Sequence, residues 1–230
     1  MRLVPPVPAD APAERLAAVR RRIERAAASA GRDPAQLVLV AVSKNHPPSA
    51  VAALAALGQR DFGESRHQEA APKAAAAPEL RWHFLGRLQR NKARAVAHWA
   101  EVVHSLDRAE LVVPLARGAE EAGRVLKVFV QVSLDGDTGR GGVPVSGAAS
   151  LADQVAAEPA LRLLGVMAVA PQGAPARPAF AALRTVGEAV RQAHPEAVSL
   201  SAGMSGDLED AVTEGATHLR VGTALFGARA

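Results

Sequence analysis

One lysine stands at the end of an uninterrupted apolar run, where a primary amine could do carbonyl chemistry. The run at residues 37–43 (LVLVAVS) leads directly into Lys44, and the chain contains only four lysines against 23 arginines. An amine can lose its proton and attack an aldehyde to form a Schiff base, which a guanidinium cannot do. Such a run is typical of a parallel strand buried on both faces, and ligands bind at the carboxyl ends of these strands. Lys44 is therefore a candidate covalent site, and a surface lysine that caps a loop is the alternative.

Two glycine-containing turns near the C-terminus have the composition of an anion site. The segments SAGMSGD (residues 201–207) and RVGTA (residues 220–224) each follow a strand-like run and bring a glycine next to a hydroxyl residue. If helices start there, backbone N–H groups are left unpaired and directed outward, and phosphate commonly binds after strands seven and eight of (β/α)8 barrels. The candidate contacts are Met204, Ser205, Gly222 and Thr223. The simpler interpretation is that Ser205 and Thr223 only cap their helices.

An amine and a phosphate site together suit one ligand that carries both an aldehyde and a phosphate, and pyridoxal 5'-phosphate (PLP) is such a ligand. Arg220 lies just before the second turn and could face the pyridine nitrogen. A guanidinium cannot accept a proton, so it would keep that nitrogen unprotonated and weaken the ring as an electron sink. We therefore expect a site that holds the cofactor better than it drives carbanion chemistry. The alternative for Arg220 is a salt bridge in the barrel mouth, for instance with Asp207.

Alternating strand-like and helical segments must position these residues. The strand-like runs are residues 37–43, 60–62, 81–85, 101–106, 126–134, 161–169, 197–201 and 218–221, and helical spacing appears between them, for example at 48–57, 89–98, 109–122 and 179–193. This alternation predicts an α/β protein, a single (β/α)8 TIM barrel over about residues 37–228 within one domain, residues 1–230. Barrel closure would bring the last strand beside the first, and with it the two turns beside Lys44. A helix at about residues 12–30 is expected to cover the bottom of the barrel, 70–77 to be helical, and 171–178 to be a loop.

Composition excludes several classes of function. The 230 residues include no cysteine, which excludes disulfides, thiolate catalysis and cysteine metal sites, and we expect no metal. We find no signal peptide and no long apolar run, so we expect a cytoplasmic protein with no membrane contact. The net charge is only +4 although the isoelectric point is about 10.3, and we expect no nucleic-acid partner. Five arginines gather on the polar face of the first helix, where a solvated surface is the favoured interpretation: Arg15, Arg20, Arg21, Arg22 and Arg25.

Seven ordered blocks carry a family resemblance. They read AVSKNHP, DFGESRHQEA, RWHFLGRLQRNK, VHSLDR, QVSLDGDTGRGG, LLGVMAVAP and LSAGMSGDLEDAVTEGATHLRVGTALFG. In this order and spacing, over about residues 10–228, the chain resembles the pyridoxal phosphate homeostasis proteins, single-domain relatives of the alanine racemase barrel. The resemblance implies a fold-type III barrel with PLP in Schiff-base linkage to Lys44 and its phosphate held around Ser205, Gly222 and Thr223.

The same resemblance implies further site residues and a role. It implies that Arg220 faces the ring nitrogen and that His83 and Asn91 lie at the barrel mouth near the cofactor. Members of the family resemble carriers or regulators of the supply of this vitamin B6 cofactor, without an established catalytic reaction. Apo forms of PLP-dependent enzymes would be the partners, and we expect a monomer or a weak dimer.

Three positions depart from the family pattern. Ser65 stands where the family commonly has asparagine, and Ala202 replaces the first methionine of the usual SMGMS. Arg140 occupies a position where a lysine is common and has been discussed as a second cofactor contact. Because an arginine cannot form an imine, covalent transfer through this position is not expected.

A PLP-dependent amino-acid racemase with weak activity is the main alternative. Two-base racemisation needs a second proton carrier opposite the lysine, which alanine racemase takes from a tyrosine of an additional β domain. This chain has no tyrosine and ends a few residues after the eighth predicted strand, so His46 or His83 would have to substitute. We therefore expect no efficient catalysis. A nucleic-acid or partner-binding module that uses the basic surface is a third, less favoured class.

Overall fold

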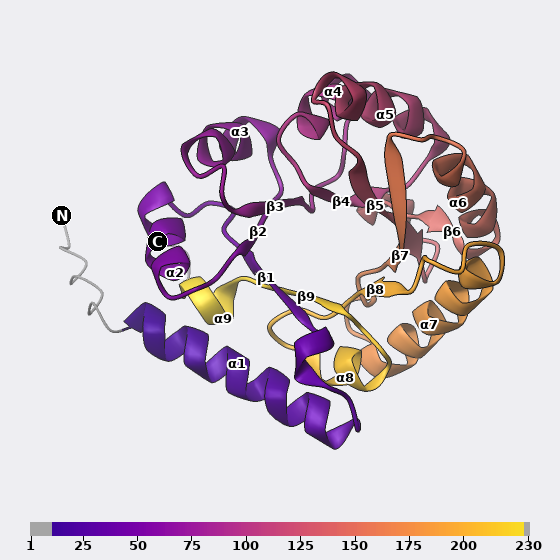
Figure 1. Ribbon diagram of the computed structural model, residues 1–230. Coiled ribbons are helices and arrows are strands. Elements are labelled where there is room, and N and C mark those ends of the chain that lie inside the picture. Colours follow the sequence, from indigo (N-terminus) through magenta and orange to yellow (C-terminus); the bar gives the residue numbers. More distant parts are fainter. Residues whose placement is uncertain (1–10, 228–230) are drawn as a thin grey trace.

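A closed ring of parallel strands forms the centre of the molecule (Figure 1). The computed structural model describes residues 11–227. Within them, each barrel strand pairs in parallel with the next and β9 pairs with β1, where Val38 lies opposite His218 and Ala41 opposite Val221. The barrel strands are β1 (Val38–Val42), β2 (Asp61–Glu64), β3 (Arg81–Phe84), β4 (Val102–Leu106), β5 (Leu126–Ser133), β7 (Leu161–Met167), β8 (Ser199–Ser201) and β9 (His218–Val221). The predicted (β/α)8 barrel is confirmed.

Helices cover the outside of this ring. They are α1 (Ala11–Ser29), α2 (Pro48–Ala56), α3 (His67–Ala76), α4 (Arg90–Ala97), α5 (Val112–Glu121), α6 (Ala148–Ala156), α7 (Ala176–Ala193), α8 (Leu208–Thr213) and α9 (Thr223–Phe226). The short strand β6 (Val143–Pro144) pairs with β5 outside the barrel. Helix α7 begins inside the segment that we predicted to be a loop, because Pro178 lies in its first turn, where a missing N–H breaks no intrahelical bond.

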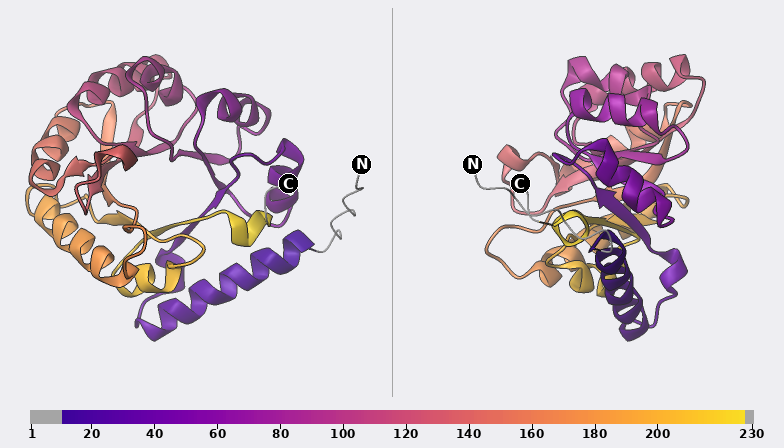
Figure 2. Two further views of the ribbon diagram at one scale, coloured as in Figure 1. Left: turned by 180° about the vertical axis from the view of Figure 1, so that it is seen from behind. Right: turned by 90° about the vertical axis from the view of Figure 1, so that its left-hand side faces the viewer.

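Helix α1 lies on the flank of the barrel, so the expectation that it covers the bottom was wrong. Its buried stripe includes Leu16, Val19 and Ile23, and the helix contacts α8, α9 and α2. Because α9 is only four residues long, strands β9 and β1 would otherwise lack a full helix over their outer side. Helix α1 fills this place in the outer layer (Figures 1 and 2).

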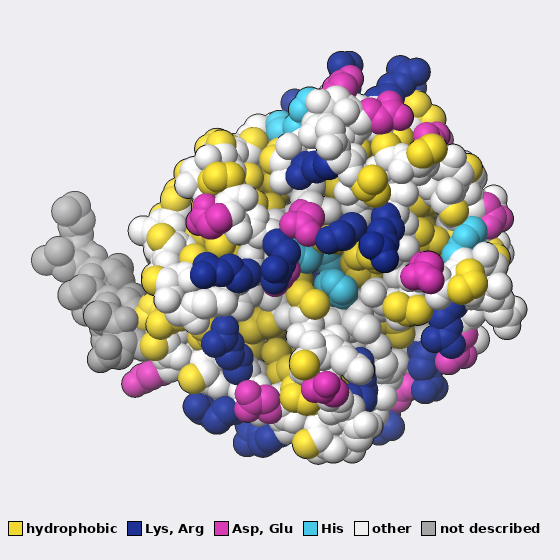
Figure 3. Space-filling view, in the orientation of Figure 1, with side chains coloured by type: hydrophobic (Ala, Val, Ile, Leu, Met, Phe, Trp, Pro, Cys, Tyr) yellow, Lys and Arg dark blue, Asp and Glu magenta, His cyan; other side chains and the backbone are white. Residues whose placement is uncertain are grey.

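The apolar core is concentrated between the strands and the helices. Inside the ring, a small apolar cluster of Val102, Phe129 and Met167 is separate from this main core. Much of the remaining interior is polar. Figure 3 shows histidine at the bottom of a central hollow, with lysine and arginine side chains gathered around it. None of the helices described over residues 11–227 is long and apolar enough to cross a membrane.

Candidate functional site

Lys44 lies in a tight turn directly after β1. The turn is held by hydrogen bonds from the Ser43 N–H to the Gly63 carbonyl at 2.9 Å and from the His46 N–H to the Ser43 carbonyl at 3.0 Å. Asn45 has a φ of 64°, a left-handed conformation that asparagine adopts more readily than most residues. Lys44 is half-buried, and its ammonium forms no hydrogen bond or ion pair with any residue in the described part of the chain. The turn therefore presents an unpaired amine at the carboxyl end of β1.

A buried ion-pair cluster supports this turn from β2 and α3, and we call it the turn clamp: Ser43, Glu64, Glu69 and Lys73. The Lys73 ammonium donates to Glu64 Oε1 at 2.7 Å, to Glu69 Oε1 at 3.0 Å and to the Ser43 carbonyl at 3.1 Å. The Ser43 hydroxyl donates to Glu64 Oε1 at 2.7 Å, and the Asn45 N–H donates to Glu69 Oε1 at 2.6 Å. The clamp thus fixes the backbone on both sides of Lys44.

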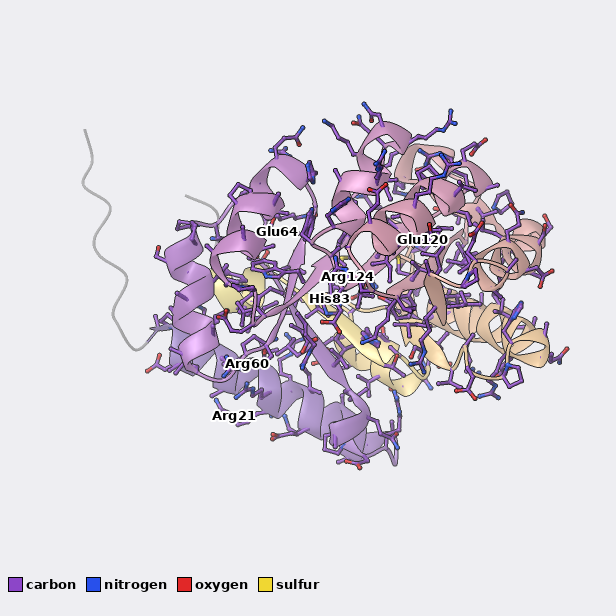
Figure 4. All side chains as sticks on the ribbon, turned by 45° about the horizontal axis from the view of Figure 1, so that its top comes forward. Arg21, Arg60, Glu64, His83, Glu120 and Arg124 are labelled. Atoms are coloured by element: carbon purple, nitrogen blue, oxygen red, sulfur yellow. The ribbon has the colours of Figure 1, made fainter. Side chains whose placement is uncertain are left out.

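The clamp contains one carboxyl oxygen without a partner. The Glu64 side chain, labelled in Figure 4, is fully buried, and its Oε2 has no hydrogen-bond partner among residues 11–227. Burial raises the pKa of Glu64, and the hydrogen bond from Lys73 opposes that rise. Sequence reasoning missed this cluster. The available signal was the i,i+4 spacing of Glu69 and Lys73 on one helix face.

The two glycine-containing turns lie side by side, as barrel closure predicts. The Ala224 N–H donates to the Ser205 hydroxyl oxygen at 3.4 Å, which joins the turn after β9 to the turn after β8. The β1 strand adjoins the same place, since a Cβ atom at Gly222 would lie 3.4 Å from the Val42 carbonyl oxygen. Within the described chain, neither Ser205 nor Thr223 caps its own helix, because the N-cap residues of α8 and α9 are Asp207 and Gly222, and the Ser205 hydroxyl instead accepts an N–H of the first turn of α9.

Two arginines of α1 brace these turns. Arg22 donates to the Ser205 carbonyl at 3.1 Å and forms an ion pair with Glu209 at 2.8 Å. Arg15 donates from Nε to the Leu225 carbonyl at 2.7 Å, in α9, the short helix that follows β9. The interpretation of the arginine group as solvated surface was therefore wrong for these two residues, which lie at the edge of the buried stripe.

Arg220 points into the barrel and is almost completely buried. Its guanidinium donates to the Ser201 hydroxyl oxygen at 2.6 Å and to the Ala168 carbonyl at 2.9 Å. Burial lowers the pKa of Arg220 to about 10, so the group is still charged at neutral pH. No ion pair forms between Arg220 and Asp207, both of which the structure describes, because Asp207 Oδ1 instead accepts the Met204 N–H at 2.5 Å. An arginine has five N–H donors, so these two bonds leave others available.

The remaining predicted site residues lie apart from this group. His83 is buried inside the barrel, with Nε2 3.1 Å from Asp61 Oδ1 and Nδ1 2.9 Å from His104 Nε2. Both of its ring nitrogens are therefore engaged within the protein. Asn91 is exposed in the first turn of α4, where it lines a groove between α4 and α5. The structure thus brings Lys44, the two turns and Arg220 to one end of the barrel and leaves Asn91 at its outer rim.

The three departures from the family pattern have simple surroundings. Arg140 forms ion pairs with Asp135 and Asp137 and donates to the Ala170 carbonyl at 3.2 Å. Ala202 is buried directly before the turn that follows β8. Ser65 packs its backbone against Gly86, where any Cβ would lie 2.0 Å from the Ser65 carbonyl oxygen. None of these contacts involves Lys44.

Comparison with known proteins identifies the relatives of this arrangement. The family model for the alanine racemase N-terminal domain matches residues 15–230. A pyridoxal phosphate homeostasis protein of Mycobacterium leprae is 44% identical, over 92% of this chain and 90% of its own length. One of Pseudomonas aeruginosa is 42% identical, over 94% of this chain and 95% of its own length. The chain belongs to the pyridoxal phosphate homeostasis protein family.

Solved structures extend this assignment. PipY from Synechococcus elongatus, whose structure was determined with PLP bound, is 39% identical in sequence to this chain. It superimposes with a TM-score of 0.83, and the match covers 94% of this chain and 100% of PipY. Alanine racemase of Corynebacterium glutamicum has the same fold at a TM-score of 0.73 and 17% identity, and the match covers 61% of the racemase. The family and the barrel type predicted from the sequence are both confirmed.

Proposed function

We propose that this chain binds PLP at the carboxyl ends of its barrel strands and holds it through a Schiff base to Lys44. The observation that carries this proposal is the closure of the barrel, which sets the Lys44 amine, unpaired among residues 11–227, beside the two adjoining turns that lead into α8 and α9. The 39% identical relative PipY was solved with PLP bound, which supports the choice of ligand. PLP supplies an aldehyde, which condenses with a primary amine and releases water.

Each part of the ligand has a proposed partner in this chain. Backbone groups around Met204, Ser205, Gly222 and Thr223 are assigned to the phosphate, because the two adjoining turns lead into helices, whose first N–H groups can donate to an anion. Arg220 is assigned to the pyridine nitrogen, because its bonds to Ser201 and Ala168 leave further N–H donors of the guanidinium available. Asn91 is assigned to the rim of the site. His83 acts from below the site, since neither of its ring nitrogens is free for a ligand.

The proposed role is to carry or buffer PLP for apo-enzymes, without efficient catalysis. The curated relatives at 42–44% identity are named for PLP homeostasis, and none of those names describes a reaction. The chain has no tyrosine to act as a second base. Of the two histidines considered in its place, His83 has both ring nitrogens engaged within the protein, and His46 stacks its ring on Phe226 with ring centroids 4.8 Å apart. A guanidinium facing the ring nitrogen also disfavours carbanion chemistry.

An absorbance spectrum followed by borohydride reduction tests this proposal. Protein incubated with PLP should absorb near the visible edge, lose this band on reduction, and carry the pyridoxyl group on Lys44 in a peptide mass analysis. Lys44→Ala should abolish the band. Lys92→Arg is the matched control, because Lys92 also has no ion-pair partner among residues 11–227 yet lies on α4. A label on Lys92 or Lys127, or exchange of the α-proton of alanine at ordinary enzyme rates, would contradict the assignment or the carrier role respectively.

A further inference from the structure

An unbroken chain of hydrogen bonds crosses the barrel interior below the proposed site, where this fold usually packs branched apolar side chains. It runs from Arg220 to the Ser201 hydroxyl (2.6 Å), from there to His104 Nδ1 (2.7 Å), from His104 Nε2 to His83 Nδ1 (2.9 Å), and from His83 Nε2 to Asp61 Oδ1 (3.1 Å). These five residues come from β9, β8, β4, β3 and β2, and each is less than 9% exposed. Figure 4 shows His83 near the centre of the barrel.

The two ends of this chain have fixed chemistry. The Arg220 guanidinium can only donate hydrogen bonds. At the other end, burial acts to raise the pKa of Asp61, but hydrogen bonds from Arg81 and His83 outweigh it and hold that pKa well below its usual range. Arg81 pairs with this carboxylate through two bonds of 2.8 and 2.5 Å. Asp61 is therefore ionised and can only accept.

Between a fixed donor and a fixed acceptor, neutral imidazoles have one arrangement that satisfies every group. His83 then carries its hydrogen on Nε2 and donates to Asp61, which leaves Nδ1 to accept from His104 Nε2–H. His104 Nδ1 in turn accepts from the Ser201 hydroxyl, which accepts from Arg220.

A protonated His83 would not satisfy every group. It would donate to His104 from Nδ1, and His104 would then donate to Ser201. The fully buried Ser201 hydroxyl would be left with a hydrogen and no acceptor among its contacts in the described chain.

The surroundings disfavour a proton on His104 and on His218, the neighbouring histidine of β9. His218 of β9 faces the chain, with its ring centroid 6.3 Å from that of His83 and 5.9 Å from that of His104. Burial lowers the pKa of His218 to about 3 and the pKa of His104 well below its usual value, and positive charge on His83, and then on Arg220, acts in the same direction, so a proton on His83 would repel one on either neighbour. Lys127 of β5 is a further positive group near His218, while Asp61 is the negative group that opposes these effects.

We propose that Asp61, His83, His104 and Ser201 form a polarised relay of positioning residues, with both imidazoles in the Nε2–H tautomer, which fixes Arg220 as the donor that faces the pyridine nitrogen of PLP. The link to PLP rests on the proposed function, whereas the polarity of the relay is a property of the chain itself. The relay ends at the ion pair of Asp61 with the half-exposed Arg81, at the opposite end of the strands from Lys44. A proton added at His83 would reverse two bonds of the relay, His83–His104 and His104–Ser201, and leave the Ser201 hydroxyl hydrogen without an acceptor among its contacts in residues 11–227.

Nitrogen NMR of the PLP-free protein tests the polarity. Protein labelled with 15N-histidine at pH 8 should show a protonated Nε2 and an unprotonated Nδ1 for both His83 and His104. Replacement of Ser201 by Ala should move the Nδ1 resonance of His104, because it removes the hydroxyl that donates to that atom. Replacement of Ser105 by Ala should leave the Nδ1 resonance of His104 in place. Ser105 lies beside His104 on β4, and its buried hydroxyl has no partner in the described chain. A hydrogen on Nδ1 of either histidine would overturn the relay.

A pH titration of the PLP-loaded protein tests the positioning role. Ser201→Ala should shift the apparent pKa of the bound cofactor's absorbance by about one unit, the size of one hydrogen bond to a charged group, while Lys44 is still labelled. Ser105→Ala should match the unchanged protein. An unshifted titration with an intact Lys44 label would overturn the relay alone. Failure of the unchanged protein to label Lys44 would instead overturn the proposed function and, with it, the role of the relay toward PLP.

Discussion

Replacing Lys73 by methionine tests the turn clamp directly. Methionine fills most of the space of the lysine stem but removes the charge and all three hydrogen bonds to Glu64, Glu69 and Ser43. The Glu64 side chain is 0% exposed and that of Lys73 is 5% exposed, so water cannot replace the missing ammonium. Among residues 11–227, the carboxylate of Glu64 would keep only the hydroxyl of Ser43 as a donor.

The expected cost follows from this geometry. Removing one partner of a buried ion pair typically costs about 3–5 kcal/mol, because the other charge stays buried without compensation. We therefore expect Lys73→Met to lower the free energy of unfolding by at least about 3 kcal/mol at pH 7. Adding Glu64→Gln should recover most of the loss, because a neutral amide has a smaller desolvation cost.

The loss should depend on pH in a definite direction. Burial raises the folded-state pKa of Glu64 above the unfolded value. Protonated Glu64 therefore contributes its full stabilisation below the pKa that it has in the unfolded chain, and this contribution is lost as the pH rises through its pKa in the folded chain. Lys73 opposes this rise, so its removal extends the window toward neutral pH. Lys73→Met should thus regain stability when the pH is lowered from 7 to 5, and the unchanged protein should regain less.

Urea unfolding followed by circular dichroism at both pH values measures these changes through the midpoint and the m-value. Lys127→Met is the matched control, because the Lys127–Glu101 pair has side chains that are 39% and 35% exposed and should contribute only about 0–1 kcal/mol. A cost below about 1 kcal/mol at pH 7 for Lys73→Met, or an equal cost at pH 5, would refute the account of a buried charge that needs its partner.

Three further predictions follow from single contacts. Arg22→Ala should weaken PLP binding about fivefold, because the turn after β8 loses its brace, and equal weakening by alanine at the neighbouring exposed Arg21, labelled in Figure 4, would contradict this. Arg220→Glu should change the absorbance spectrum of bound PLP more than the affinity, and an unchanged spectrum would remove Arg220 from the ring nitrogen. Gly165→Ala should cost at least about 3 kcal/mol in thermal unfolding, since φ is 147° and the new Cβ would lie 1.9 Å from the Ser199 carbonyl oxygen, whereas Gly206→Ala, with open space around it, should be close to neutral.

The barrel could be predicted from the sequence because its strands are continuous apolar runs separated by helical spacing. The residues at which strands begin and end were less predictable, because an apolar residue next to a strand can be exposed and belong to the preceding turn. Strand β8 begins at Ser199 and not at residue 197, since Val198 is 58% exposed and the Ala197 N–H closes a turn onto the His194 carbonyl. The alternation implied a helix between the strand-like runs 126–134 and 161–169, but the range of α6 was not predicted. Helix α1 was predicted without its correct position, which depends on the shortness of α9.

The site was predictable only where backbone connectivity determines it. Closure of β1 onto β9 is enough to bring Lys44 to the two turns. The relay could not be predicted in this way, because the register of β2, β3, β4 and β8 decides which of their side chains point into the barrel. The HSL and WHF motifs by themselves do not indicate that His104 and His83 meet. The placement of His83 beside the cofactor, as the family resemblance implied, accordingly gives way to a proposal in which it acts through Arg220.

The three supports of the proposed site share no residue, and this makes their contributions separable. The turn clamp holds the backbone around Lys44, the α1 arginines brace the two turns, and the relay fixes Arg220. Changes at separate sites without shared partners usually combine to within about 0.5 kcal/mol, whereas members of one network do not. The combined variant Lys73→Met, Arg22→Ala should therefore weaken PLP binding by the product of the single effects, while Ser201→Ala with Asp61→Asn should fall short of that product. Equal coupling in both pairs, measured by PLP titration, would mean that the barrel mouth responds as one unit and would contradict the division into three supports.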